Sequence, residues 1–196
     1  MKKYIVLPLF LLLLIISGCS SEDYQLEKSV FIEDITNPGL PVYSEWGYNT
    51  FGAYIDREVF VSNDSDLPAK IIVNADTFNL SFKGTLDSEI VTLRFTIIGF
   101  SPADYPDLVS LNDSTIDLTA DNCFITLIKD TTILKLDVFQ GKLYFKRVQN
   151  LYVDKVLSET ILSGYFNFKT FMHNEPVSIS NGRFDVGIGF NNFYNF

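Results

Sequence analysis

The segment VTLRFTI, residues 91–97, decides the fold class. Val91, Leu93, Phe95 and Ile97 occupy every second position, and polar or charged residues fill the positions between them. Successive side chains of a β-strand point to opposite faces of the sheet, so this spacing places all four apolar side chains on one face. A period of two that is sustained over about 4–8 residues predicts a strand with one buried face.

The same alternation recurs along most of the chain after residue 49. It is found in residues 78–83, 134–138, 142–146, 162–169 and 184–190. Short stretches rich in Asn, Asp, Ser or Gly predict turns at Asn63–Asp66, Lys83-Gly84, Asn112-Asp113, Gln140-Gly141 and Asn181-Gly182. No segment of helical length has a convincing 3.6-residue period, and Gln149 to Ser158 is the best candidate for a short helix.

Strands that are joined by tight turns pair antiparallel, because a parallel pair needs a long crossover connection. We therefore expect an all-β fold, a single antiparallel domain of about ten strands built as a β-sandwich or a partly closed barrel. The periodicity of the strands does not choose between these two architectures.

The first 19 residues carry the pattern of an export signal. Lys2 and Lys3 precede an apolar run over residues 5–16, which is shorter than the roughly 20 residues that a transmembrane helix needs. The length of this run suits a signal peptide. The segment Ile16-Ser17-Gly18-Cys19 resembles the lipobox of bacterial lipoproteins. This resemblance implies that residues 1–18 are removed and that Cys19 becomes an N-terminus carrying fatty acyl chains such as palmitate. A secretory signal with a chance cysteine is the alternative.

Four polar residues follow this cysteine: Ser20, Ser21, Glu22 and Asp23. They resemble the serine- and acid-rich export signal of surface-exposed lipoproteins of Bacteroidota-type bacteria, which implies a lipid-anchored outer-membrane protein displayed on the cell surface. The alternative is a solvated acidic tether without a sorting role. Pro and Gly between residues 38 and 41 favour extended or turning backbone. The predicted organisation is a signal peptide (1–18), a tether (19–45) and a β domain (46–196).

The composition limits the possible partners. The signal peptide contains two of the 15 Lys and Arg residues, so the mature chain keeps 13 against 24 Asp and Glu. Such an acidic chain without a basic block cannot neutralise phosphates, and we expect no nucleic-acid partner. Acylation of Cys19 leaves Cys123 as the remaining cysteine, so no intramolecular disulfide is expected. Because Cys123 shares a strand face with Ile125 and Leu127, it is expected to be a small buried residue rather than a catalytic thiol.

A second resemblance brackets the β domain. The segments that carry it are Thr50-Phe51-Gly52, Ser163-Gly164-Tyr165-Phe166-Asn167-Phe168 and Asn181-Gly182-Arg183-Phe184-Asp185. They are similar to a group of uncharacterised Bacteroidota-type surface lipoprotein domains of unknown function that open with a Thr-Phe-Gly hairpin. That group usually has Asn-Gly or Asp-Gly at the hairpin turn, where this chain has Asp56-Arg57. The resemblance implies a domain type and no activity. We expect Gly164 to allow a close approach of backbone within a strand.

The residues that most enzymes need are sparse. His173 is the one histidine in the sequence, which excludes a His-pair zinc site, and the chain has no nucleophile elbow or phosphate-binding loop. Asn63–Asp66 offers oxygen ligands for Ca²⁺ but lacks the EF-hand spacing, and a hairpin turn is the simpler interpretation. We therefore expect no catalytic residues, no metal and no cofactor. A small hydrolase that uses a carboxylate pair is the remaining enzymatic alternative.

Aromatic side chains are the remaining candidates for ligand binding. Trp46, Tyr48 and Tyr54 lie where the tether meets the domain, and Phe193 and Tyr194 lie near the C-terminus. Exposed rings there would stack on a sugar or hold a protein partner, whereas rings that cap the core would do neither. The sequence therefore predicts a lipid-anchored, non-enzymatic binding or accessory module for a glycan or protein partner, with a structural subunit of an envelope complex as the alternative. Rings in a concave groove would favour a glycan, and an exposed apolar patch would favour a protein.

Overall fold

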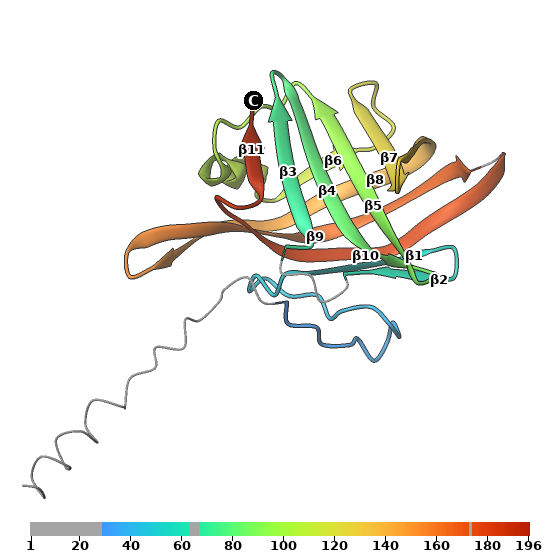
Figure 1. The fold of residues 1–196 in the computed structure, drawn as a ribbon, viewed down its shortest axis with the longest axis horizontal. Helices are drawn as coiled ribbons and strands as arrows, with labels where there is room; N and C mark the ends of the chain where they lie inside the picture. The colour runs from blue at the N-terminus through green and yellow to red at the C-terminus, as the bar shows by residue number, and fades with distance from the viewer. Residues whose placement is uncertain (1–28, 63–66, 173) are drawn as a thin grey trace, which may run out of the picture.

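A single sheet wraps around the hydrophobic core of this chain (Figure 1). The structure is a computed structural model that describes residues 29–62, 67–172 and 174–196. Its strands are β1 (Thr50–Ile55), β2 (Glu58–Val61), β3 (Ala69–Asn74), β4 (Thr77–Leu86), β5 (Glu89–Ile98), β6 (Ser114–Asp117), β7 (Cys123–Lys129), β8 (Thr132–Val153), β9 (Val156–Met172), β10 (Glu175–Ile188) and β11 (Phe193–Asn195). One short 3₁₀ helix, η1 (Tyr105–Leu111), precedes β6. The expected all-β class is confirmed, with eleven strands in the sheet rather than about ten.

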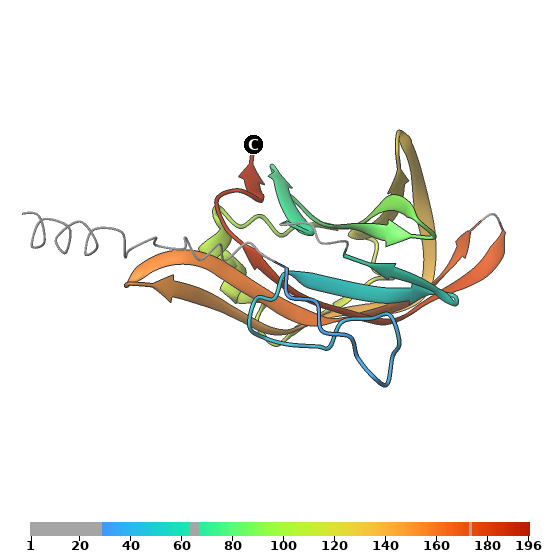
Figure 2. The ribbon, with the colours of Figure 1, turned by 60° about the horizontal axis from the view of Figure 1, so that its bottom comes forward.

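The strand pairings run in a ring. Starting from β4, they pass through β2, β1, β10, β9, β8, β7 and β5, and β5 pairs with β4 again. The shortest pairing in the ring is that of β2 with β4, in which Phe60 pairs with Leu86 and Val61 with Thr85. β3 and β11 extend the sheet beyond β4, and β11 pairs with β3 in parallel. The arrangement therefore resembles the partly closed barrel of the two predicted architectures, with the sheet curling around its contents (Figure 2).

Five phenylalanine rings join the two sides of the ring through the core. Phe82 on β4 lies with its ring centroid 5.2 Å from that of Phe51 on β1 and 5.3 Å from that of Phe184 on β10. It also lies 6.1 Å from both Phe95 on β5 and Phe166 on β9. All five side chains are at most 1% exposed. Burial of such large rings contributes to the hydrophobic stabilisation that holds the sheet in its curved form.

The predicted faces of the strands are confirmed where the alternation is strict. Val91, Leu93, Phe95 and Ile97 are all buried on β5, as are Phe78, Leu80 and Phe82 on β4. Cys123 begins β7 as a buried free cysteine, and burial raises its pKa to about 11. A thiol with that pKa is protonated at neutral pH, which agrees with the expected structural role. The alternation in residues 184–190 ends early, because Phe190 is exposed beyond the end of β10.

Three of the predicted turns are wrong, because they lie inside long strands. Gly84 is within β4, whose turn to β5 falls at Asp87 and Ser88. Gln140-Gly141 is within β8, a strand of 22 residues, and Asn181-Gly182 is within β10. At the last two positions the pairing register shifts, as in a β-bulge, and Asn181 has a φ of 52°. Gly and Asn at these positions serve bulges and close packing instead of chain reversal.

The predicted short helix at Gln149 to Ser158 is also wrong. These residues form the end of β8, a turn at Asp154 and Lys155, and the start of β9. The hairpin projects from one end of the molecule, and the β9–β10 hairpin projects from the other (Figure 1). By contrast, the expected turn at Asp56-Arg57 is confirmed, with Asp56 at a φ of 53° between β1 and β2. The predicted turn at Asn63–Asp66 lies outside the described residues.

Gly164 on β9 is a position where the sheet has no room for a side chain. A Cβ there would lie 2.7 Å from the Cζ of Phe184 and would collide with the backbone carbonyl of Tyr144 on β8. The predicted close approach of backbone at Gly164 is confirmed, and the ring of Phe184 covers the glycine from the inside of the sheet.

We therefore expect Gly164→Ala to lower the free energy of unfolding by about 2 kcal/mol, because the added methyl group overpacks the core. Urea denaturation of the purified mature protein measures this change. Lys142→Ala, at an exposed position of β8, is the control and should unfold like the wild type. Equal stability of Gly164→Ala and the control would contradict the packing shown for this glycine.

Candidate functional site

Residues 29–49 form a loop that folds back on itself below β1 and β10, and this loop is called the strap (Figure 2). Its two halves are joined by backbone hydrogen bonds from Val42 N to Ile32 O at 2.7 Å and from Asp34 N to Leu40 O at 2.8 Å. Leu40 is completely buried. Residues 29–45, the later part of the predicted tether, are therefore packed against the domain, while the earlier part lies outside the described residues.

The carboxylate of Asp185 on β10 holds the strap in place. Five groups donate hydrogen bonds to it: the N–H groups of Trp46, Gly47 and Tyr48 and the hydroxyls of Ser44 and Ser163. The N–H bonds span 2.9–3.2 Å, and Asp185 is 1% exposed. A buried carboxylate is stable only when its oxygens are hydrogen-bonded, and here four of the five donors belong to the strap.

Arg183 makes a second attachment, two residues before Asp185. Its guanidinium Nη1 lies 2.5 Å from the Oδ2 of Asp34 on the strap. Asp34 also accepts hydrogen bonds from Thr36 and Asn37, and these bonds, followed by that from Arg183, hold the pKa of Asp34 well below its usual range. Asn181 adds a bond from its Nδ2 to the Oδ1 of Asn37 at 2.8 Å. The strap turn at residues 34–37 is thus tied to β10 by polar contacts.

The second half of β10, residues 182–188, is consequently buried on both faces. Residues Asn181, Arg183 and Asp185 point outward to the strap, and the N–H of Gly187 donates to Asn49 Oδ1 at 2.8 Å. Phe184, Val186 and Ile188 point inward and belong to the core. The segment Asn-Gly-Arg-Phe-Asp at residues 181–185 therefore alternates between contacts to the strap and contacts to the core.

We expect Asp185→Ala to lower the free energy of unfolding by about 3 kcal/mol, because it leaves several buried donors without an acceptor. Asp185→Asn keeps one oxygen acceptor and should lose less. Thermal unfolding, together with limited proteolysis within the strap, measures both effects. A strap that stays protease-resistant in Asp185→Ala would contradict the role assigned to this carboxylate.

The structure places the first three predicted ligand residues on or beside the strap. Trp46 is 76% exposed. Tyr48 is half-buried, and its carbonyl accepts a hydrogen bond from Val30 N at 2.8 Å. Tyr54 is half-buried on β1, and its hydroxyl donates to Pro38 O at 2.9 Å. Tyr48 and Tyr54 therefore help to hold the strap, and Trp46 is the ring of the three that is open to solvent.

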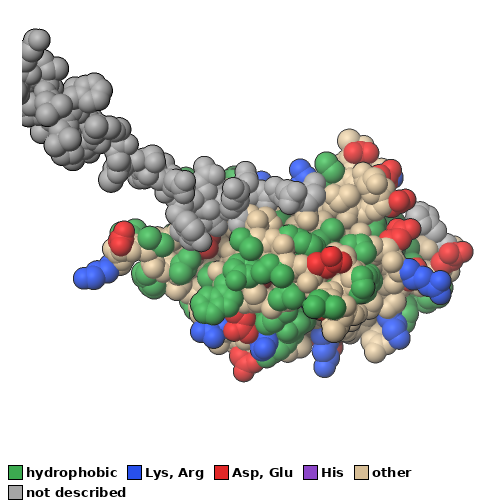
Figure 3. Space-filling view, turned by 90° about the horizontal axis from the view of Figure 1, so that it is seen from below, with side chains coloured by type: hydrophobic (Ala, Val, Ile, Leu, Met, Phe, Trp, Pro, Cys, Tyr) green, Lys and Arg blue, Asp and Glu red, His purple; other side chains and the backbone are tan. Residues whose placement is uncertain are grey.

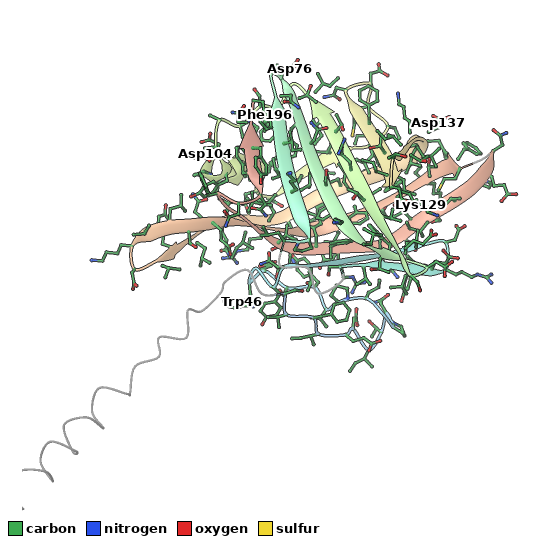
Figure 4. The ribbon with its side chains drawn as sticks, viewed as in Figure 1. Trp46, Asp76, Asp104, Lys129, Asp137 and Phe196 are labelled. Carbon is green, nitrogen blue, oxygen red and sulfur yellow. The ribbon has the colours of Figure 1, made fainter. Side chains whose placement is uncertain are left out.

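The two C-terminal candidates lie elsewhere. Phe193 is buried and packs edge-on against Tyr105 of η1, with ring centroids 6.5 Å apart. Tyr194 is half-buried, stacks on Phe196, and has the Lys70 Nζ 4.3 Å from its ring centroid. Trp46 and Phe196 lie at opposite ends of the molecule (Figure 4). The five predicted rings therefore do not form one platform.

The strap carries a set of apolar side chains that point to solvent, and this set is called the strap face. Its members are Val30, Phe31, Ile32, Ile35, Val42 and Trp46. Ile35 is 95% exposed at the strap turn. The view from below shows hydrophobic side chains gathered on this side of the molecule (Figure 3). Contiguous exposed apolar surface of this kind is typical of a docking site.

A groove lies at the end of the molecule where the β1–β2 and β9–β10 hairpins meet, and it is called the hairpin groove. It has a volume of about 770 Å³. Its floor is apolar and is built from Ile55, Leu86, Met172 and Val177, which pack against the core. Its rim is charged and consists of Asp56, Arg57, Glu58 and Glu175, all exposed. Both the size and this division between an apolar floor and polar rim are typical of ligand sites.

One wall of the groove is fixed by the β1–β2 turn. Asp56 N donates to Ser178 O at 2.8 Å, and Asp56 Oδ1 accepts from Ser178 N at 3.0 Å. Backbone N–H direction alternates along a strand, so Pro176 is the next residue of β10 whose backbone faces this side. Proline has no N–H, and this edge therefore does not offer a template for an added strand. A ligand of the groove would be held by side-chain contacts.

The other residues predicted to form sites are not among those that the structure describes. Cys19 and residues 20–23 lie outside the described residues, as do Asn63–Asp66 and His173. Within the residues that the structure describes, no group of three or more His, Cys, Asp or Glu side chains is arranged to hold a metal ion. In the same part of the chain, no helix has the length and apolarity of a membrane span.

Sequence reasoning missed the groove and the buried attachments of the strap. Asp34, Arg183 and Asp185 are ordinary charged residues in the sequence, and their partners lie about 140 positions away along the chain, as for Ser44 and Asp185 with a separation of 141. Arg183 and Asp185 do fall within residues 181–185, one of the segments singled out in the sequence, which was the one available signal.

Comparison of this chain with protein-family models, with curated proteins and with solved structures finds no match in any of the three.

Proposed function

We propose that this protein is a lipid-anchored accessory module of a bacterial outer membrane, displayed at the cell surface, which binds a protein partner in the hairpin groove without acting as an enzyme. The lipobox at Ile16–Cys19 and the acidic residues after it support the anchor and the location. The observation that carries the binding role is the groove itself, about 770 Å³ of space with an apolar floor and a charged rim.

A protein partner is favoured over a glycan by the composition of the groove. Among the described residues, those that line it include no aromatic ring, and stacking on rings is the usual way in which a binding module holds a sugar. Trp46, the most exposed of the predicted rings, lies on the strap and does not line this groove. Three carboxylates against one guanidinium on the rim favour a partner segment that carries basic side chains.

The carboxylates of the groove also bear on the hydrolase alternative. Asp56, Glu58 and Glu175 line one site, as a carboxylate-pair enzyme requires. All three are exposed, whereas a carboxyl group that acts as a general acid is usually kept protonated by a water-poor environment. Their exposure therefore supports recognition of charge rather than acid–base chemistry.

The lipid anchor predicts that cells fed with labelled palmitate will transfer the label to the full-length chain. Cys19→Ala should abolish labelling, because acylation needs that thiol. Cys123→Ala is the matched control, since it removes the other cysteine and should leave labelling intact. Protease treatment of intact cells then tests display, with loss of the domain expected. Labelling of Cys19→Ala would refute the anchor, and protection of the domain until lysis would refute display at the cell surface.

For the groove, we expect a photo-crosslinking amino acid at Glu175 to form a discrete protein adduct in intact cells. The matched control is the same amino acid at Tyr152, an exposed position on the opposite hairpin. Adding Glu58→Lys should reduce the adduct by about three- to tenfold, because it reverses a rim charge that faces a basic partner. Identical adducts at both positions, or none at Glu175, would instead favour a structural subunit without a partner in this groove.

A further inference from the structure

The strap face is a dense set of exposed apolar side chains. Its six side chains lie within 17 consecutive residues, from Val30 to Trp46, and Ile35 and Trp46 are 95% and 76% exposed. Leaving apolar surface in water costs about 25 cal/mol per Å². The cost persists in this protein unless another apolar phase covers the face.

The strap face is a preformed surface. The loop that carries it is bound to β10 through Asp185 and Arg183, and Leu40 is completely buried beside Gly52 of β1. The backbone of Trp46 is held by a hydrogen bond from its backbone N–H to Asp185 Oδ2 at 3.2 Å. Docking through this face therefore needs little further ordering of the chain, which lowers the entropic cost of binding.

Two of the three acidic residues of the strap are paired with cations. Asp34 is paired with Arg183, and Glu45 lies 3.6 Å from Lys146 and 3.4 Å from Arg147. The third, Glu33, is exposed and accepts a hydrogen bond from Gly39 N at 2.8 Å. With 13 Lys and Arg against 24 Asp and Glu, the mature chain has a formal charge of −11, so this local pairing matters where a surface approaches anionic lipid. Close to the strap face, the repulsion expected from the overall charge is reduced.

The chain that leads to Cys19 starts from this same loop. Nine residues, 20–28, separate Cys19 from residue 29, where the strap begins. The ten steps from one residue to the next span at most about 35 Å, whatever their conformation. A bilayer that holds the acyl chains of Cys19 is therefore within reach of the strap face, and a face so placed is close to an apolar phase at all times.

We propose that the strap face docks on the bilayer in which Cys19 is anchored, with Ile35 and Trp46 entering the boundary between headgroups and acyl chains. The inference rests on the proposed lipid anchor and adds a second contact to it. Tryptophan is favoured at that boundary because its ring is apolar and its N–H is polar. This contact fixes the orientation of the domain, and with it that of the hairpin groove.

Trp46 is the one tryptophan of the sequence, so its fluorescence reports on the strap face alone. The experiment reconstitutes the full acylated chain into vesicles of phosphatidylethanolamine and phosphatidylglycerol, with and without bromine on the acyl chains. Docking predicts that brominated lipid lowers Trp46 emission about twofold, because amphipathic surfaces enter the bilayer to the depth of the upper acyl chain. The Trp46 emission of the anchored chain in unbrominated vesicles should also lie at shorter wavelength than that of a reference sample. The reference is the domain in buffer, released from its lipidated N-terminus by proteolysis.

Ile35→Asp should restore most of the Trp46 emission, because a carboxylate does not enter the apolar region. Phe196→Asp is the matched control, since Phe196 is 79% exposed at the opposite end of the molecule, and it should leave quenching unchanged (Figure 4). A chain that sediments with the vesicles but shows no bromine quenching overturns the docking and leaves the lipid anchor intact. A chain that fails to sediment overturns the anchor, and the docking with it. A blue shift in native membranes, with neither a blue shift nor bromine quenching in the lipid vesicles, overturns bilayer docking in favour of a covering protein.

Discussion

The buried carboxylate of Asp185 is the interaction on which the outer half of this structure depends. It gathers three consecutive backbone N–H groups and two hydroxyls, and it does so on a strand whose inner face is part of the core. Without an acceptor, those donors would be buried unpaired, at a cost comparable to the loss of several hydrogen bonds. The strap is thereby made an integral layer of the domain, although it makes a single isolated bridge and no strand.

β10 also connects the two surfaces to which we assign function. In its first part, Glu175, Val177, Ser178 and Ser180 line the hairpin groove. In its second part, Asn181, Arg183, Asp185 and Gly187 hold the strap. The register shift between Ile179 and Gly182 separates the two parts and lets the outward positions change. Because one strand carries both, the groove and the strap face have a fixed relative orientation, so a contact of one surface with a membrane also determines the direction in which the other points.

The sequence predicted strands well and turns poorly, for the same physical reason. The predicted burial of every second residue is found at Val91, Leu93, Phe95 and Ile97. Side chains alternate between the two faces of any extended strand, so this pattern depends only on residues that are adjacent in the chain. Gly84, Gly141 and Asn181-Gly182 were interpreted as turns because Gly and Asn favour reversals. Here they lie where another strand or a ring approaches too closely for a Cβ, or where a bulge occurs. At 22 residues, β8 is several times the usual length of a strand, about 5–6 residues, and no local signal gives such a length.

By itself, the sequence determined the all-β class and the buried faces of the strict strands, because both depend on residues that are close together in the chain. The tertiary structure alone decided where the polar attachments and open surfaces lie. Asp185 finds Ser44 across 141 positions, and the groove needs two hairpins that the ring of strands brings to one end. Those contacts depend on how the sheet closes around its phenylalanine core, and that closure is a property of all the strands together.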